Sequence, residues 1–140
     1  MKIRIRNIIS LVRWLQALPL SSEISKERTR FIKMAEPYIN DLLMKRGEIL
    51  NKYAEKDENG QLKMEEKDGV RRHIIPKDKE GQAEKEYADT LGTILEIPLD
   101  GNKSKLLSIK EILKTTSYEF SGWLADEYLA WDEAFESVVK

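Results

Sequence analysis

One long amphipathic stretch, residues 22–54, constrains the fold of this chain more than any other part of the sequence. Its apolar side chains recur every three or four positions from Phe31 to Ala54, which places them on one wide face of a helix. At 1.5 Å per residue such a helix is roughly 45–50 Å long, longer than a compact domain of this size is wide. The other segments of the chain, or a second protein, must therefore cover its apolar face.

Pro37 interrupts this stretch and leaves two interpretations open. A proline inside a helix removes one backbone hydrogen bond and costs about 3 kcal/mol unless neighbours compensate. The stretch is therefore either one helix kinked near residues 33–36, or two helices with Pro37 in the first turn of the second. The apolar stripe continues across Pro37 without a change of phase, so we expect one kinked helix.

The segment before this helix predicts a second, shorter helix. Residues 2–6 alternate basic residues with isoleucine, which is typical of a short basic edge strand or of the start of a helix. Asn7 is the expected N-cap of a helix over residues 8–18, which Pro19 ends. Because the link to the long helix is short, the two helices are expected to fold back on each other.

Turn signals in the middle of the chain predict a β-hairpin. Asn59-Gly60 ends the long helix, and the Asp68-Gly69 turn separates alternating segments at 61–66 and 70–75. A polar helix over 77–90 and a strand over 93–99 are expected next, the strand at a sheet edge because of Pro98. That strand is a candidate third strand for the hairpin.

Two further helices are expected in the last third, over residues 104–116 and after an N-cap at Ser121, with the tryptophans Trp123 and Trp131 as core anchors. The predicted fold is a single α+β domain over residues 1–140, mainly α. In it, a kinked long helix lies in a helical bundle, accompanied by a small antiparallel hairpin or three-stranded sheet. The N-terminal helices form a hairpin on which the C-terminal pair packs.

Composition excludes several classes of protein. The chain has no cysteine, which removes disulfides, thiolate catalysis and cysteine-based zinc sites. Its net charge of −1 indicates neither a globally basic nucleic-acid binder nor an acidic mimic. No apolar run is long enough to cross a membrane. Arg13 and Gln16 interrupt the apolar part of the N-terminus, so a secretory signal is not expected and the chain is predicted to be cytosolic.

No motif predicts catalysis, a cofactor or a metal site. His73 is the only histidine, and no acidic or nucleophilic partner for it is evident; a phosphate contact shared with Arg71 and Arg72 is the alternative to a solvent-facing strand residue. The calcium-loop-like oxygens that begin at Asp57 fail the EF-hand pattern, which requires glycine where Leu62 stands. We therefore predict that this protein is not an enzyme.

Charge is unevenly distributed along the chain. Basic residues crowd the first quarter, whereas none occurs from residue 117 to 139, where the last helix carries an acidic face. Such asymmetry indicates contacts between opposite ends, within one molecule or between copies, or a basic patch for nucleic acid. The candidate interaction residues are Arg4, Arg6, Arg28, Arg30, Arg71, Arg72, Trp131, Asp132 and Glu136.

The chain also resembles a family of small uncharacterised proteins encoded by phages and prophages of Gram-positive bacteria, a domain of unknown function. The resemblance rests on residues 18–33, 53–60, 108–122 and 127–136, whereas residues 63–89 match poorly. The genes of this family tend to lie near late, virion-related genes, and the family offers no catalytic residues to carry over.

The resemblance implies a non-enzymatic phage protein of the host cytoplasm that acts through protein–protein interaction, such as a virion or tail assembly accessory factor. Its partner would be another phage or host protein, or a second copy of the chain, with no membrane and no small-molecule substrate. The alternatives are an inhibitor of a host protein, such as an anti-phage defence system, and a nucleic-acid-binding accessory protein.

Overall fold

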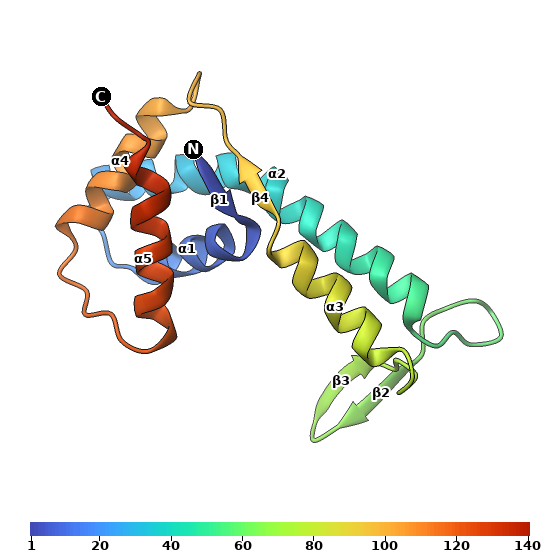
Figure 1. The fold of residues 1–140 in the computed structure, drawn as a ribbon. Coiled ribbons are helices and arrows are strands. Elements are labelled where there is room, and N and C mark those ends of the chain that lie inside the picture. Colours follow the sequence, from blue (N-terminus) through green and yellow to red (C-terminus); the bar gives the residue numbers. More distant parts are fainter. The chain divides into compact units, whose positions relative to one another are not determined.

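The fold is α+β and mainly helical, as predicted, in a computed structural model that describes all residues from 1 to 140 (Figure 1). In chain order the elements are β1 (Lys2–Arg4), α1 (Ile5–Ala17), α2 (Ser22–Tyr53), β2 (Met64–Lys67), β3 (Val70–His73), α3 (Glu80–Leu91), β4 (Ile94–Glu96), α4 (Lys103–Thr115) and α5 (Trp123–Glu136).

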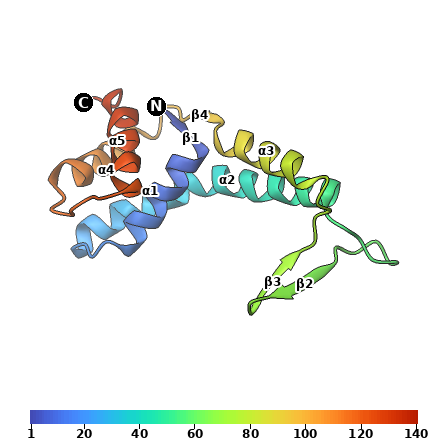
Figure 2. The same cartoon turned by 60° about the horizontal axis from the view of Figure 1, so that its bottom comes forward.

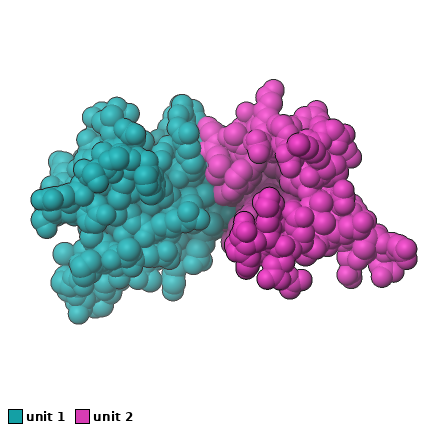
Figure 3. Space-filling view, turned by 90° about the horizontal axis from the view of Figure 1, so that it is seen from below, with its two compact units in different colours: residues 1–39, 93–140 teal, residues 40–92 magenta.

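The chain divides into two compact units, which Figure 3 colours separately. Unit 1 comprises residues 1–39 and 93–140, and unit 2 comprises residues 40–92. Helix α2 is one helix that runs through Pro37, as expected, and it contributes its first half to unit 1 and its second half to unit 2. The description of residues 1–140 as a single domain stays a prediction.

Unit 1 contains the hydrophobic core. Helices α1, α4 and α5 lie close together in both ribbon views (Figures 1 and 2), and their apolar faces meet the first half of α2. Phe31 of α2 is completely buried, and its ring lies 6.3 Å from that of Phe135 on α5, measured between centroids. The apolar stripe of α2 is thus covered by later helices in this unit. Further fully buried side chains are Ile8, Leu11, Leu15, Leu106, Ile109, Leu113 and Trp131.

Strands β1 and β4 form a two-stranded antiparallel sheet in unit 1, in which Ile3 pairs with Leu95. The N-terminal ammonium donates a hydrogen bond to the carbonyl of Ile97 at 2.8 Å. The expectation that the strand near residues 93–99 joins the hairpin is wrong, because the hairpin strands β2 and β3 pair only with each other. Pairing with β1 buries both Ile3 and Ile97, which supplies the physical reason.

Two predicted helix caps are also corrected. Helix α1 begins at Ile5 rather than after Asn7, so Asn7 lies inside the helix and is buried. Helix α5 is preceded by Gly122 rather than capped by Ser121. Gly122 has φ 57° and ψ −140°, a backbone conformation that essentially only glycine adopts.

In unit 2, α3 lies alongside the second half of α2 (Figures 1 and 2), and β2 and β3 form an antiparallel hairpin in which Lys67 pairs with Val70. Asp68 and Gly69 form its two-residue turn with φ of 54° and 78°, respectively. Two successive positive φ values are the mark of a type I′ turn, for which Asp-Gly is a favoured sequence. The prediction of this hairpin is confirmed.

Replacing Gly69 by alanine tests how strongly this turn fixes the hairpin. A Cβ at Gly69 meets no atom within 4 Å, so the cost arises from its positive φ alone and is about 1–2 kcal/mol. We expect Gly69→Ala to weaken the cross-strand NMR contacts between β2 and β3. Gly47→Ala, within α2 and equally unobstructed, is the control and should stabilise its helix by about 0.5–1 kcal/mol. Intact hairpin contacts in Gly69→Ala would contradict this account.

Candidate interaction surfaces

A buried polar network joins α1 to α5. The Asn7 Nδ2 and the Ser10 Oγ each donate a hydrogen bond to the Glu127 carboxylate, both at 2.7 Å. The Trp131 Nε1 donates to the backbone carbonyl of Asn7 at 2.8 Å. Because buried polar groups must be satisfied, this network favours one packing arrangement of the two helices over others.

Loss of the Asn7 amide should destabilise unit 1. Asn7→Ala leaves the half-buried Glu127 carboxylate with one donor fewer, which costs about 1–3 kcal/mol. The free energy of unfolding in urea, followed by tryptophan fluorescence, measures this loss. Glu119→Gln, at an exposed position between α4 and α5, is the control and should change stability by no more than about 0.5 kcal/mol. Equal effects of the two substitutions would show that the network contributes nothing.

Trp131 is therefore a core residue, and its candidate role in partner binding is wrong. It is fully buried and forms, with Trp14, Tyr118, Phe120 and Tyr128, an aromatic cluster. The rings of Trp14 and Trp131 lie 5.5 Å apart, and those of Phe120 and Tyr128 stack at 4.3 Å. This cluster attaches the segment between α4 and α5 to α1, and the buried Nε1 of Trp14 has no hydrogen-bond partner.

Three of the candidate arginines are engaged within the chain. Arg28 donates hydrogen bonds to the carbonyls of Leu15 and Leu18 at 2.9 and 2.6 Å, which satisfies the C-terminal end of α1. Arg30 pairs with Glu27 one turn earlier on α2. Arg72 pairs with Glu65 across the hairpin at 3.0 Å. The Arg28 side chain thus has a structural role at the end of α1.

The other three candidate arginines, Arg4, Arg6 and Arg71, are exposed and take part in no ion pair. In the hairpin register Arg71 and His73 share one face, whereas Arg72 lies on the opposite face. The structure therefore does not bring these three side chains together as one phosphate contact. An interaction role for Arg4, Arg6 and Arg71 stays a prediction.

The outer face of α5 carries negative charge at a position that costs stability. Asp132, Glu133 and Glu136 are exposed near the C-terminal end of the helix, form no ion pair, and have no basic residue in the last turn. Carboxylates there oppose the negative end of the helix dipole, and like charges three or four residues apart repel each other. Asp132 and Glu136 are exposed and unpaired, and an interaction role for them stays a prediction.

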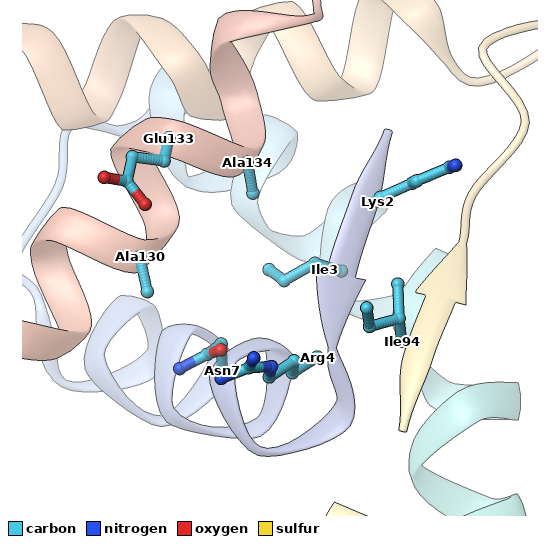
Figure 4. A pocket seen from close by; sticks show the side chains of 8 residues that line it. All are labelled: Lys2, Ile3, Arg4, Asn7, Ile94, Ala130, Glu133 and Ala134. Carbon is cyan, nitrogen blue, oxygen red and sulfur yellow. The ribbon is translucent and has the colours of Figure 1, made fainter. Parts of the chain in front are cut away.

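A hollow of about 360 Å³ lies between β1 and α5 in unit 1 (Figure 4). The side chains of Ile3, Ala130 and Ala134 form its apolar part. In Figure 4, Glu133 lies on the α5 side of the hollow, and Lys2 and Arg4 belong to the β1 side. A basic strand and an acidic helix therefore border one shallow apolar depression.

Exposed apolar side chains occur on both units. In unit 1, Trp123 is 69% exposed, so the prediction that it is a core anchor is wrong. In unit 2, Leu43 and Met44 are 57% and 67% exposed. The signal for these two was present: Leu42, Leu43 and Met44 are consecutive, and successive helical residues point about 100° apart, so the three cannot share one buried face.

Polar side chains tie α2 to α3 in unit 2. The Tyr53 hydroxyl donates to the Glu86 carboxylate at 2.5 Å, and the Lys52 ammonium pairs with it at 2.8 Å. These hydrogen bonds, first the one from Lys52, lower the pKa of Glu86 below its ordinary value, and the carboxylate in turn raises the pKa of Lys52.

No histidine, cysteine or carboxylate cluster is arranged to hold a metal ion. None of the helices combines the length and apolar character of a membrane span.

Comparisons with family models, curated proteins and solved structures found no match to this chain.

Proposed function

We propose that this protein acts without catalysis, as a protein–protein interaction module in which unit 2 is the docking arm. The observation that carries this proposal is the contrast between what unit 2 buries and what it exposes. Its buried apolar residues are only Leu42, Tyr53, Ala54 and Ala83. Its exposed large apolar residues are Leu43, Met44, Met64 and Val70.

A unit that buries so little apolar surface has little to offset the conformational entropy lost on folding. Two of its four buried residues are alanines, which contribute the least area. A partner that covers Leu43 and Met44 would supply the burial that the unit lacks, at about 25 cal/mol for each Å² removed from water. Binding and stabilisation of unit 2 would then be linked.

The hairpin supports the same proposal. All residues of β2 and β3 except His73 are exposed, on both faces of the two-stranded sheet. A two-stranded hairpin is marginally stable in water unless another element packs on it. Its type I′ turn and the Arg72–Glu65 pair hold its shape, while both of its faces remain open to a partner.

The polar clusters support a non-catalytic role because each has a structural use. Asn7, Ser10 and Glu127 hold α1 on α5, and Tyr53, Lys52 and Glu86 hold α2 on α3. No group in either cluster is left over as a nucleophile or general base for a bound substrate.

The resemblance to phage-encoded proteins suggests which partner to expect. We propose that the docking arm binds another phage protein, as a virion or tail assembly accessory factor does. Inhibition of a host defence protein is the alternative outcome, and the two differ in the identity of what the arm captures.

Capture by arm variants tests this proposal. The tagged full-length chain is recovered from a Gram-positive host during phage infection, and bound proteins are identified by mass spectrometry. Leu43→Glu/Met44→Glu should remove the specific partner because two charges replace the apolar contact, a loss of about tenfold or more in recovery. Val139→Glu, an equally exposed apolar site in unit 1, should retain it.

The identity of the captured partner decides between the alternatives. A virion or tail protein supports assembly, and a host defence protein supports inhibition. Equal recovery of every protein by the native chain and the arm variant would overturn the assignment of unit 2 as the docking arm.

A further inference from the structure

We infer that unit 1 associates with a second copy of itself across the hollow between β1 and α5, as a two-fold symmetric dimer. This inference concerns a different unit from the docking arm and does not depend on the function proposed for it. It rests on the unpaired charges of unit 1, on their arrangement at the hollow, and on the apolar surface between them.

Among the exposed charges of unit 1 that form no ion pair, two sets of opposite sign lie on neighbouring elements, and exposed Glu96 lies opposite Lys2 in the sheet register. The basic set lies on β1 and α1, and the acidic set lies on α5. All members are exposed and none forms an ion pair within the chain. The basic set is Lys2, Arg4, Arg6 and Arg13; the acidic set is Asp126, Asp132, Glu133 and Glu136.

Three of these charges line the hollow: Lys2 and Arg4 of β1 and Glu133 of α5. In Figure 4 Glu133 lies on the α5 side, and the Lys2 side chain extends from β1 away from α5. A surface with a basic half beside an acidic half is complementary to itself when the two-fold axis runs along the boundary between the halves, because that rotation places each basic half on the acidic half of the other copy. A second copy in this orientation therefore carries the charges that the surface needs.

Apolar side chains that line the hollow offer area for such a contact, Ile94 on β4 and two alanines on α5. Ile94 lies opposite Arg4 in the sheet register and is 60% exposed. The small side chains of Ala130 and Ala134 let another surface approach α5 closely. Dimer formation would displace water from Ile94 and from the two alanines. This burial of apolar surface adds to the free energy of association, and salt does not screen it.

Other occupants fit this surface less well. Nucleic acid would meet Glu133 and its acidic neighbours beside the basic strand, and like-charge contacts of this kind suppress binding. A uniformly basic protein would be repelled by Lys2 and Arg4 in the same way. A surface with basic and acidic residues side by side favours a partner that places acidic residues opposite β1 and basic residues opposite α5.

Charge reversal in the full-length chain tests the dimer, with mass measured by analytical ultracentrifugation over a range of concentrations at low and high salt. The native chain should dimerise, and more weakly at high salt. Arg4→Glu or Glu133→Arg alone should weaken the dimer about tenfold or more, because each places like charges opposite each other twice. The double variant Arg4→Glu/Glu133→Arg restores opposite charges and should dimerise within about threefold of the native chain.

Glu119→Arg, an exposed acidic position outside the hollow, is the control and should leave the dimer unchanged. Arg4→Glu is compatible with folding, since Arg4 makes no capping bond and a carboxylate is favourable at the start of α1; circular dichroism verifies this for every variant. A native chain that stays monomeric at all concentrations, or a double variant as weak as the single ones, would overturn the inference. The arm variant Leu43→Glu/Met44→Glu should still dimerise, which separates this result from the test of the docking arm.

Discussion

Helix α2 is the constraint on which the rest of the structure depends. Its apolar stripe runs through both units, so the elements of each unit must cover one half of it. In unit 1 Phe31 and Ala35 are fully buried under a core built from α1, α4 and α5. In unit 2 only Leu42 and Tyr53 reach comparable burial along the helix. The same element therefore belongs to a well-packed unit in its first half and to a thinly packed unit in its second. Since packing of the apolar face supplies most of the stability of a helix in a protein, the two halves are held by very different free energies.

Polar side chains reinforce this difference. In unit 1 they act inside the structure: Glu127 accepts two hydrogen bonds between α1 and α5, and Arg28 satisfies the last carbonyls of α1. In unit 2 the Lys52–Glu86 pair is half exposed, and a pair screened by solvent in this way contributes little to stability. Among the charges that unit 1 leaves unpaired on its surface, basic residues lie on β1 and α1 and acidic residues lie on α5. Residues that are far apart in the sequence thus form two groups of opposite charge on neighbouring elements.

Much of the fold could be predicted from the sequence, because its strongest signals are local. The period of the apolar residues predicted α2 to within a residue of its observed end at Tyr53, and the Asp68-Gly69 turn predicted the hairpin. The wrong predictions concern features that depend on contacts between segments far apart in the sequence. Asparagine is a favoured N-cap residue, but the side-chain amide of Asn7 instead donates a hydrogen bond to the carboxylate of Glu127, 120 positions away. The strand β4 pairs with β1 at the other end of the chain, a choice that no local pattern specifies.

The candidate site was predicted less well, because exposure depends on which side of each helix its neighbours cover. Asp132 and Glu136 were placed correctly on the surface of α5, whereas Trp131 lies in the core and Trp123, eight positions earlier, is exposed. The periodicity of α5 admits both tryptophans near its apolar side. Only the position of α1, fixed through Asn7 and Trp14, decides that Trp131 is covered.

The most direct measurement is amide hydrogen exchange along α2 in the isolated full-length chain, because exchange reports the local free energy of opening. The account predicts strong protection around Phe31 and Ala35 and exchange at least about tenfold faster in residues 40–53, within the same continuous helix. Uniform protection from residue 25 to residue 53 would contradict it, since the two units would then be equally stable and unit 2 would need no partner to complete its packing.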